Sequence, residues 1–157
     1  MAILVVSDSH GKVDRVIKAI EENKNKIDRV CFTGDGLEDI KFLEGEYKDI
    51  IFDYVAGNCD GYIAKPSEKI IMYNGKKILL THGHLYEGIS GQKRLLAKCK
   101  AEGINAVFWG HTHLKKEEYI ENILFLNPGS IGRPFDGNPS YSIVEIGDKI
   151  KNTVYYI

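Results

Sequence analysis

The chain contains 157 residues, of which 43% are hydrophobic and 27% are charged, and its formal net charge at pH 7 is −1. This composition is typical of one soluble globular domain, so we expect a single domain over residues 1–157. The small net charge gives no reason to expect nucleic acid or an acidic membrane as the main partner. The opening apolar run, residues 2–6, is too short for a signal peptide or a membrane span.

Three cysteines, Cys31, Cys59 and Cys99, are widely spaced and form no CxxC pair. An odd number of isolated cysteines favours a reduced protein, and we therefore expect a cytoplasmic location. The sequence contains no internal repeat and no low-complexity tract.

The first third of the chain alternates short apolar runs with a stretch of helical spacing. Apolar residues at 13, 16, 17 and 20 predict a helix over 13–24, whereas 36–47 is a weak helix or a loop. The apolar runs predict strands at residues 2–6, 28–34 and 50–57. Alternating strands and helices of this kind indicate parallel strand pairing.

The rest of the chain carries hairpin signals around one helix and one strand. Ser90 is a possible N-cap and Gly103 a stop signal for a helix over 90–103, and a strand is predicted at 105–110. Hairpins are predicted over 69–83 around Asn74-Gly75, over 117–127 around Glu121-Asn122, and over 141–157 around Gly147-Asp148. Because hairpins add antiparallel strands, we predict an α/β layered domain with mixed sheets.

Polar residues of metal-binding type follow five of the apolar runs. The set consists of Asp8, His10, Asp35, Asn58, Cys59, His82, His84, His111 and His113. The carboxyl ends of parallel strands meet at one edge of a sheet, so we expect these side chains to converge. The protein has five histidines and all of them belong to this set. In an extended chain, residues two apart such as His111 and His113 point to the same side.

Oxygen and imidazole donors together suit Mn, Fe, Co, Ni or Zn, among which we favour manganese and also consider nickel. Two aspartates, one asparagine and four histidines are too many for one tetrahedral ion and suit two ions that share a bridge. Two ions about 3.5–4 Å apart are the arrangement used for in-line displacement at phosphorus. With two aspartates and one hydroxide, two divalent ions leave a charge of about +1, which would attract a phosphate ester.

The segments "DSH" (8–10), "GD" (34–35), "GNCD" (57–60), "HGH" (82–84) and "GHTH" (110–113) resemble, in order and spacing, the signature of calcineurin-like metallophosphoesterases. The sequence has no inserted segments between these motifs, and in this it resembles the small prokaryotic single-domain phosphodiesterases. This resemblance implies a four-layer α-β-β-α sandwich, with two mixed sheets flanked by helices and no cap domain.

The resemblance also implies a role for each donor. Asp8, His10 and His113 would hold the first metal, and Asn58, His82 and His111 the second. Asp35 would bridge the two ions. A hydroxide between the metals would attack phosphorus in a phosphate ester, more specifically a phosphodiester.

The sequence departs from the family pattern at Cys59, where many members carry a histidine that protonates the leaving group or steadies the phosphate. A thiol with an ordinary pKa of about 8.5 could donate a proton but cannot act as an imidazolium. His84 is the substitute candidate if its segment is extended, with a supporting role as the alternative. Cys59 could instead be a small buried residue that fills space.

Several other readings stay open. Asp8 or Asp35 taken alone would be a cap or turn residue, and Asn127 would hold its own turn. Arg133 could clamp a phosphate or be a solvated loop residue. A retromer subunit of the same family has lost ligands and activity, so an inactive scaffold for protein–protein interaction is the alternative function. A homo-oligomer is also possible.

Overall fold

The computed structural model describes residues 1–61 and 66–157, and these residues form two five-stranded mixed sheets. The first sheet has the order β10-β9-β1-β2-β3 and the second the order β4-β5-β6-β8-β7. The strands of the first sheet are β1 (Ala2–Val6), β2 (Ile27–Phe32), β3 (Ile51–Tyr54), β9 (Ser140–Ile146) and β10 (Ile150–Tyr156). Those of the second are β4 (Glu68–Tyr73), β5 (Lys76–Thr81), β6 (Ala106–Phe108), β7 (Lys115–Ile120) and β8 (Ile123–Pro128).

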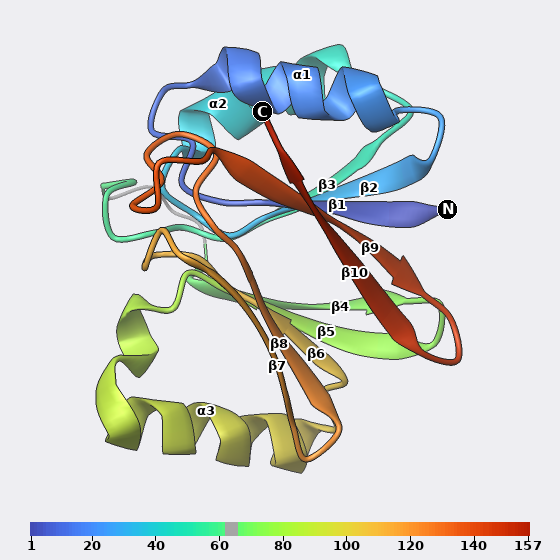
Figure 1. Ribbon diagram of the computed structural model, residues 1–157. Coiled ribbons are helices and arrows are strands. Elements are labelled where there is room, and N and C mark those ends of the chain that lie inside the picture. Colours follow the sequence, from blue (N-terminus) through green and yellow to red (C-terminus); the bar gives the residue numbers. More distant parts are fainter. Residues whose placement is uncertain (62–65) are drawn as a thin grey trace.

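Helices cover the outer faces of the two sheets. The helical elements are α1 (Val13–Asn23), α2 (Leu37–Glu46), the 3₁₀ turn η1 (His84–Tyr86) and α3 (Gly88–Glu102). In Figure 1, α1 and α2 lie above the first sheet and α3 lies below the second, with the two sheets stacked between them. The prediction of a four-layer α-β-β-α sandwich is therefore confirmed.

The central strand β1 shows why its sequence is uniformly apolar. Alternate side chains of a strand point to opposite faces. Leu4 and Val6 enter the core under α1 and α2, whereas Ile3 and Val5 enter the core between the two sheets. Both faces of β1 are thus buried, and the strand pairs in parallel with β2 and antiparallel with β9.

All three predicted hairpins form, and their turns lie at the predicted positions. Asn74 and Gly75 both have positive φ, of 47° and 76°, and so do Glu121 and Asn122, of 48° and 65°. Positive φ at both central residues is the geometry of a type I′ turn, which matches the twist of the flanking strands. Glu121 adopts this conformation although its side chain does not favour it.

Two expectations about helices change. Residues 37–46 form α2, so the segment read as a weak helix or loop is a helix. Ser90 is not an N-cap, because α3 begins at Gly88 after Glu87. The helix starts close to η1, and Gly91 permits this because a Cβ there would lie 2.4 Å from the carbonyl carbon of Tyr86. Gly103 is the C-cap in left-handed conformation, as predicted.

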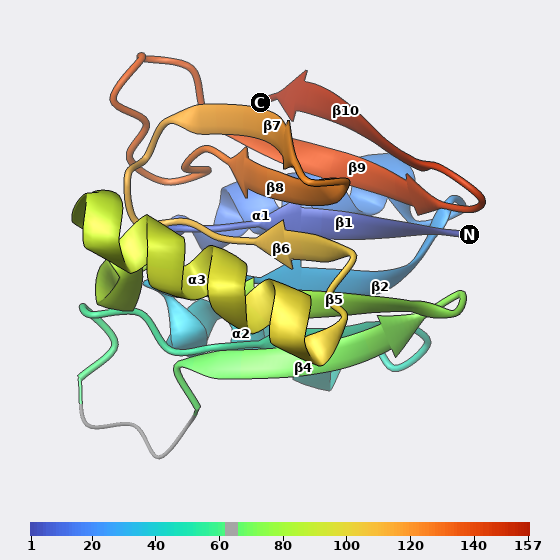
Figure 2. The same cartoon turned by 90° about the horizontal axis from the view of Figure 1, so that it is seen from below.

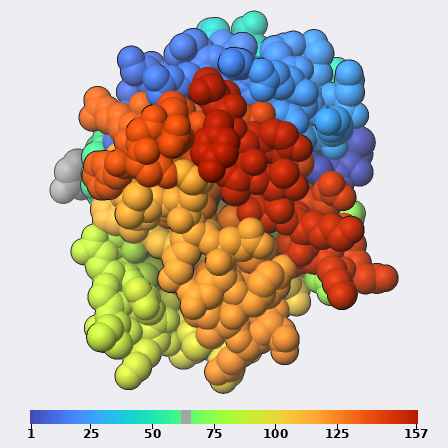
Figure 3. Space-filling view, viewed as in Figure 1, coloured from blue at the N-terminus to red at the C-terminus, as the bar shows by residue number. Residues whose placement is uncertain are grey.

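The parallel strands place the candidate donors at one end of the molecule. The loops after β1, β2, β3, β5 and β6 gather at the left of Figure 1. In the space-filling view, the orange loop between β8 and β9 lies at the surface at the same end (Figure 3). Among the residues described, none of the helices has both the length and the apolar character that crossing a membrane requires.

Candidate metal centre

Five of the candidate donors have backbone conformations that L-residues rarely adopt. Positive φ values between 45° and 69° occur at Asp8, His10, Asp35, His111 and His113. In the described part of the chain, the other non-glycine residues with positive φ are at the hairpin turns. Left-handed residues cost of order 1–3 kcal/mol each and persist where the surroundings enforce them. The surrounding structure therefore holds these loops in strained backbone conformations that orient the donor side chains.

Asp8 is fully buried and its two carboxylate oxygens have different surroundings. Oδ2 accepts hydrogen bonds from the Ser7 hydroxyl and, at 3.1 Å, from the backbone N–H of His111. Oδ1 is buried, has no hydrogen-bond partner among the residues that the structure describes, and lies 3.1 Å from His113 Nε2. A buried carboxylate oxygen without a hydrogen bond is costly unless a cation compensates its negative charge. The residues present therefore fit a metal ion at this point.

The imidazoles of His113 and His10 complete a first group of donors. The Nδ1–H of His113 donates to the carbonyl oxygen of Arg133 at 2.6 Å, which leaves Nε2 as the nitrogen that faces inward. His10 Nε2 lies 3.3 Å from His113 Nε2 and 3.9 Å from Asp8 Oδ1. Donor atoms of these three residues lie within 4.8 Å of one another, which is close enough to surround one ion.

A second group of donors forms around His82, which is fully buried. Its Nδ1–H donates to the carbonyl oxygen of Thr33 at 2.7 Å, so its Nε2 also faces the site. That nitrogen lies 3.0 Å from Asn58 Oδ1 and 3.4 Å from Asp35 Oδ2. Asp35 Oδ2 is also 3.9 Å from His10 Nε2. A single carboxylate oxygen of Asp35, Oδ2, therefore faces donors of both groups.

His111 lies beside this second group without joining its donor atoms. Its ring centroid is 5.0 Å from that of His82, but its Nε2 pairs with Glu87 Oε1 at 2.6 Å. The centroid of the His84 ring lies 5.5 Å from that of His82 and 6.2 Å from that of His111. The Nδ1 of His84 is buried and has no hydrogen-bond partner within residues 1–61 and 66–157. Both histidines thus stand at the rim of the cluster.

Residues 1–149 match the calcineurin-like phosphoesterase superfamily domain. The chain belongs to the calcineurin-like phosphoesterase superfamily. A phosphodiesterase of Methanocaldococcus jannaschii is 30% identical over 166 residues, covering 95% of each chain. A predicted phosphoesterase from Streptococcus pneumoniae has a crystal structure with a TM-score of 0.84 at 30% identity, covering 99% of this chain and 88% of that chain. Zinc-complexed Vps29 from Entamoeba histolytica shares the fold, with a TM-score of 0.77 at 22% identity over 99% of each chain.

The resemblance drawn from the five motifs is thereby confirmed, although the route to their convergence differs from the expected one. We expected extended segments in which residues two apart share a side. Instead, His84 begins η1 after Gly83, which has a φ of 105°, and His111 and His113 both have left-handed backbones. Tight turns, rather than strand alternation, aim these side chains of the calcineurin-like site.

Three further expectations have clear outcomes. Cys59 is exposed, so its reading as a buried space-filling residue is wrong. Arg133 has an exposed side chain, and its backbone carbonyl is the part that contacts the site, through His113. Asn127 holds its own turn as predicted, because its Oδ1 accepts the Gly129 N–H at 2.9 Å. Its amide nitrogen also donates to Gly110 O at 2.8 Å and to Thr112 Oγ1 at 3.1 Å, which ties the turn to the loop after β6.

The charges of the calcineurin-like cluster perturb one another. Burial raises the pKa of Asp8, against the hydrogen bond from Ser7. Burial alone would also raise the pKa of Asp35, but hydrogen bonds from His82 and from the Cys59 N–H hold it well below its usual range. Burial lowers the pKa values of His10 and His84. Neutral imidazoles keep a lone pair, which is the form that binds a metal.

Asp60 supports the site and was not singled out from the sequence. Its carboxylate accepts four backbone N–H groups at 2.7–2.9 Å, from Asp35, Gly36, Leu37 and Gly57. It therefore joins the start of α2 to the loop that carries Asn58. Its place as the last residue of "GNCD" was a signal that could have found it. Glu87, the partner of His111, had no such signal.

Two glycines permit the close approach of the donor loops. A Cβ on Gly57 would lie 2.1 Å from Asp35 Oδ1, and one on Gly110 would lie 2.6 Å from Asp8 Oδ2. Both distances are far below van der Waals contact, so a larger residue at either position would displace a donor.

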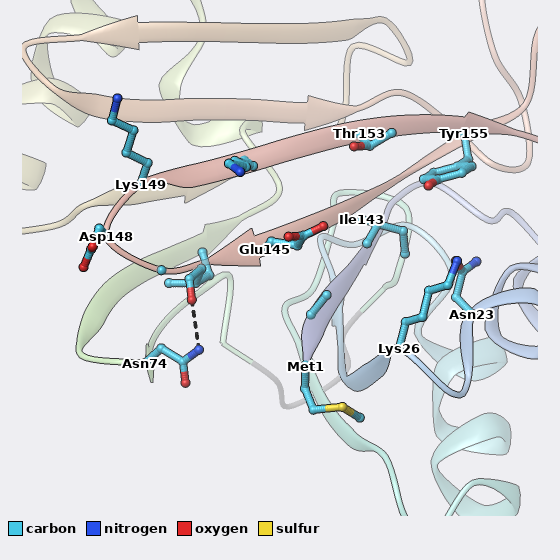
Figure 4. A pocket seen from close by; sticks show the side chains of 14 residues that line it. Met1, Asn23, Lys26, Asn74, Ile143, Glu145, Asp148, Lys149, Thr153 and Tyr155 are labelled. Carbon is cyan, nitrogen blue, oxygen red and sulfur yellow. Dashed lines mark hydrogen bonds between the residues drawn. The ribbon is translucent and has the colours of Figure 1, made fainter.

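A separate hollow lies away from the candidate metal centre and is not the candidate active site. It has a volume of about 830 Å³ and is lined by β9, β10 and the start of the chain. Figure 4 shows Met1, Glu145, Lys149 and Tyr155 around it. Among the residues that the structure describes, its lining includes none of the seven candidate metal donors. Convergent donors, not volume, identify the site.

Proposed function

We propose that the chain, as one domain over residues 1–157, is a dinuclear metal-dependent phosphodiesterase. Asp8, His10 and His113 would hold one divalent ion, and Asn58, His82 and His111 the other, with Asp35 between them. The observation that carries this proposal is the position of Asp35 Oδ2, 3.4 Å from His82 Nε2 and 3.9 Å from His10 Nε2. His111 would exchange its contact with Glu87 for the metal.

Two bound divalent ions would polarise the phosphate and lower the pKa of the attacking water. The protein's own residues prepare the site for this. The carbonyls of Thr33 and Arg133 fix the inward-facing nitrogens of His82 and His113. Ser7 and the His111 N–H orient the Asp8 carboxylate.

Protonation of the leaving group would fall to His84, whose Nδ1 is buried beside His82 and His111 without a hydrogen-bond partner in the described part of the chain. Cys59 is the weaker candidate, because the hydrogen bond of its thiol to Asp35 raises the pKa of that thiol. A proton held this firmly is a poor donor to a departing alkoxide. A diester with a good leaving group would need neither residue.

Charge favours a diester over a monoester. Two divalent ions with Asp8, Asp35 and a hydroxide leave about one positive charge, which balances a diester monoanion. A monoester dianion would leave the site negative.

The test uses metal-stripped protein reconstituted with Mn, Ni, Co, Fe or Zn. We expect up to two ions per chain and faster hydrolysis of bis(4-nitrophenyl) phosphate than of 4-nitrophenyl phosphate, with manganese preferred. Folded protein that binds no metal would overturn the metal centre. A preference for the monoester with every metal would overturn the substrate class.

The second candidate function is an inactive or weakly active scaffold. The observation in its favour is a pair of exposed apolar side chains near the site, Ile89 at 76% and Phe135 at 75% exposure. Against it, all seven candidate donors are present. Full metal occupancy without hydrolysis of any ester would favour the scaffold.

Partners and location follow from the same reasoning. A phosphate ester is the proposed substrate, and a homo-oligomer remains a prediction that size-exclusion chromatography with light scattering would test. All three cysteines are free. Free thiols fit the predicted cytoplasmic location, which fractionation of the source cells would test.

A further inference from the structure

An apolar groove borders the candidate metal centre at His111. It has a volume of about 690 Å³ and lies between α3 and the β7–β8 hairpin. Figure 2 shows α3 lying across β5 and β6, beside β7 and β8. The groove is lined by His111 and, among its apolar residues, by Tyr86, Ile89, Trp109, Leu114, Phe125 and Phe135. Its volume is in the range of small-molecule sites, about 300–1,000 Å³.

The groove is continuous with the candidate donors at two points. His111 is part of its wall. Phe135, also in the wall, packs on the ring of His113 with centroids 4.9 Å apart, and its N–H donates to His113 O at 3.3 Å. A phosphate at the donors would therefore have one of its ester groups beside the mouth of the groove.

The apolar wall is exposed where a ligand would rest on it. Ile89 and Phe135 are 76% and 75% exposed, and Leu114 is 47% exposed. Trp109 and Phe125 lie deeper, packed in or against the core between α3 and the second sheet. Aromatic walls of this kind favour flat rings, which gain offset or edge-to-face contacts that an alkyl chain does not.

The charges around the groove cancel. Lys93 and Lys116 are balanced by Glu87 and Glu118. Lys116 pairs with Glu118 at 2.7 Å. Glu87, which His111 would release on binding the metal, still balances the charge of Lys93. The groove therefore offers no net charge for a second phosphate or a carboxylate. It suits an uncharged group.

We propose that this groove binds an uncharged aromatic ester group of the phosphodiester, while the phosphate lies at the donors. This inference rests on the proposed function and names the substrate class more closely. The groove would select diesters by the ester group that stays on phosphorus, independently of the chemistry at the donors.

The kinetic test holds the leaving group constant. 4-Nitrophenyl phenyl phosphate and 4-nitrophenyl methyl phosphate both release 4-nitrophenolate and differ in the group that stays on phosphorus, so their kcat/KM values are each divided by the rate constant of the uncatalysed hydrolysis. We expect kcat/KM for the phenyl ester to be about tenfold higher. Equal values would overturn the proposal.

A pair of isoleucine variants locates the effect. In Ile89→Ser the ratio of the two kcat/KM values should fall towards one. The matched control is Ile51→Ser on β3, which changes an isoleucine of 55% exposure outside the groove and the site and should keep the wild-type ratio. Unchanged ratios in both variants would overturn the proposal. So would a change of oligomeric state in Ile89→Ser, since the groove would then be an interface between copies.

A binding test separates this proposal from the proposed function. Trp109 is the single tryptophan and lines the groove, so its fluorescence reports on it. Phenylphosphonate added to the zinc-loaded protein should change the emission of Trp109, and methylphosphonate should change it much less. A tryptophan response without hydrolysis of either ester would refute the phosphodiesterase and keep the groove. Hydrolysis without ester preference or tryptophan response would refute the groove and keep the phosphodiesterase.

Discussion

Replacing Asp35 with asparagine removes one negative charge from the middle of the donor cluster and keeps the size of the side chain. Asp35 is 3% exposed, and its Oδ1 accepts the Cys59 N–H at 2.8 Å. An asparagine oxygen could keep that hydrogen bond. Its amide nitrogen would then take the place of Oδ2, where it would face His82 and His10 with a donor instead of an acceptor.

The charge term sets the size of the effect. At an effective dielectric constant of about 20, a negative and a positive unit charge about 3–4 Å apart interact by about 4–5 kcal/mol. Water that enters the site and rearrangement of the other donors would remove part of this. If about half survives, metal affinity should fall about 100-fold. Because Asp35 faces both donor groups, we expect both ions to be weakened, which distinguishes it from a donor that serves one ion.

The assay is isothermal titration of manganese into metal-stripped protein, with hydrolysis of bis(4-nitrophenyl) phosphate measured in parallel. The matched control is Asp53→Asn, which changes a buried aspartate that pairs with Arg29 and Lys69 away from the site. That variant should lose stability but keep metal affinity. Wild-type affinity for both ions in Asp35→Asn would refute the bridging position.

Three other perturbations test separate parts of the structure. General acid catalysis contributes about 10²–10⁴-fold, so Cys59→His should speed diesters with alkoxide leaving groups more than nitrophenyl diesters, and His84→Ala should slow the former selectively with metal content intact. An equal loss for all leaving groups in His84→Ala would make that residue a positioning group. Asp60→Ala removes the acceptor of four backbone N–H groups and should lower the free energy of unfolding by about 3 kcal/mol, whereas Asp60→Asn should lower it less. A change below about 1 kcal/mol in Asp60→Ala, measured by urea denaturation, would contradict that role. Burial raises the pKa of Cys99 from 9.0 to about 11. The buried thiol therefore stabilises the fold fully below pH 9, and about 2 kcal/mol of stability is lost as the pH rises to about 11. Cys99→Ala should flatten this part of the stability–pH curve, and an identical curve would show that the thiol is not linked to folding.

The sequence predicted the strands, two helices and three hairpins because their signals are local. Apolar spacing over 13–24 and the Asn74-Gly75 pair depend on a few neighbouring residues and on the pleat or pitch of the chain. The α2 segment was harder to recognise, since only Leu37, Ile40 and Leu43 of it are buried. Its start is held by Asp60, a long-range contact that local patterns do not contain.

The candidate donors could be named from the sequence because metal chemistry restricts residue types and because parallel strands end at one edge. How the donors reach the centre could not be predicted. Positive φ at Asp8, His10 and Asp35 depends on the packing of loops from both sheets, and a dipeptide carries no such information. The pairing of Glu87 with His111 and the exposure of Cys59 depend on the same loop packing.

The candidate donors are divided between two sheets that share no strand. Asp8, His10, Asp35 and Asn58 follow strands of the first sheet, and the three other donors follow strands of the second. Ions held between the two sheets would bind the folded chain and not the unfolded one, because only folding brings the donors together. For each bound ion, a tenfold rise in free metal above its dissociation constant would then add about 1.4 kcal/mol to the free energy of unfolding, which thermal melts at graded manganese concentrations would measure. In a cell starved of that metal, the amount of the protein would decline together with its catalytic activity, since a less stable chain is degraded sooner.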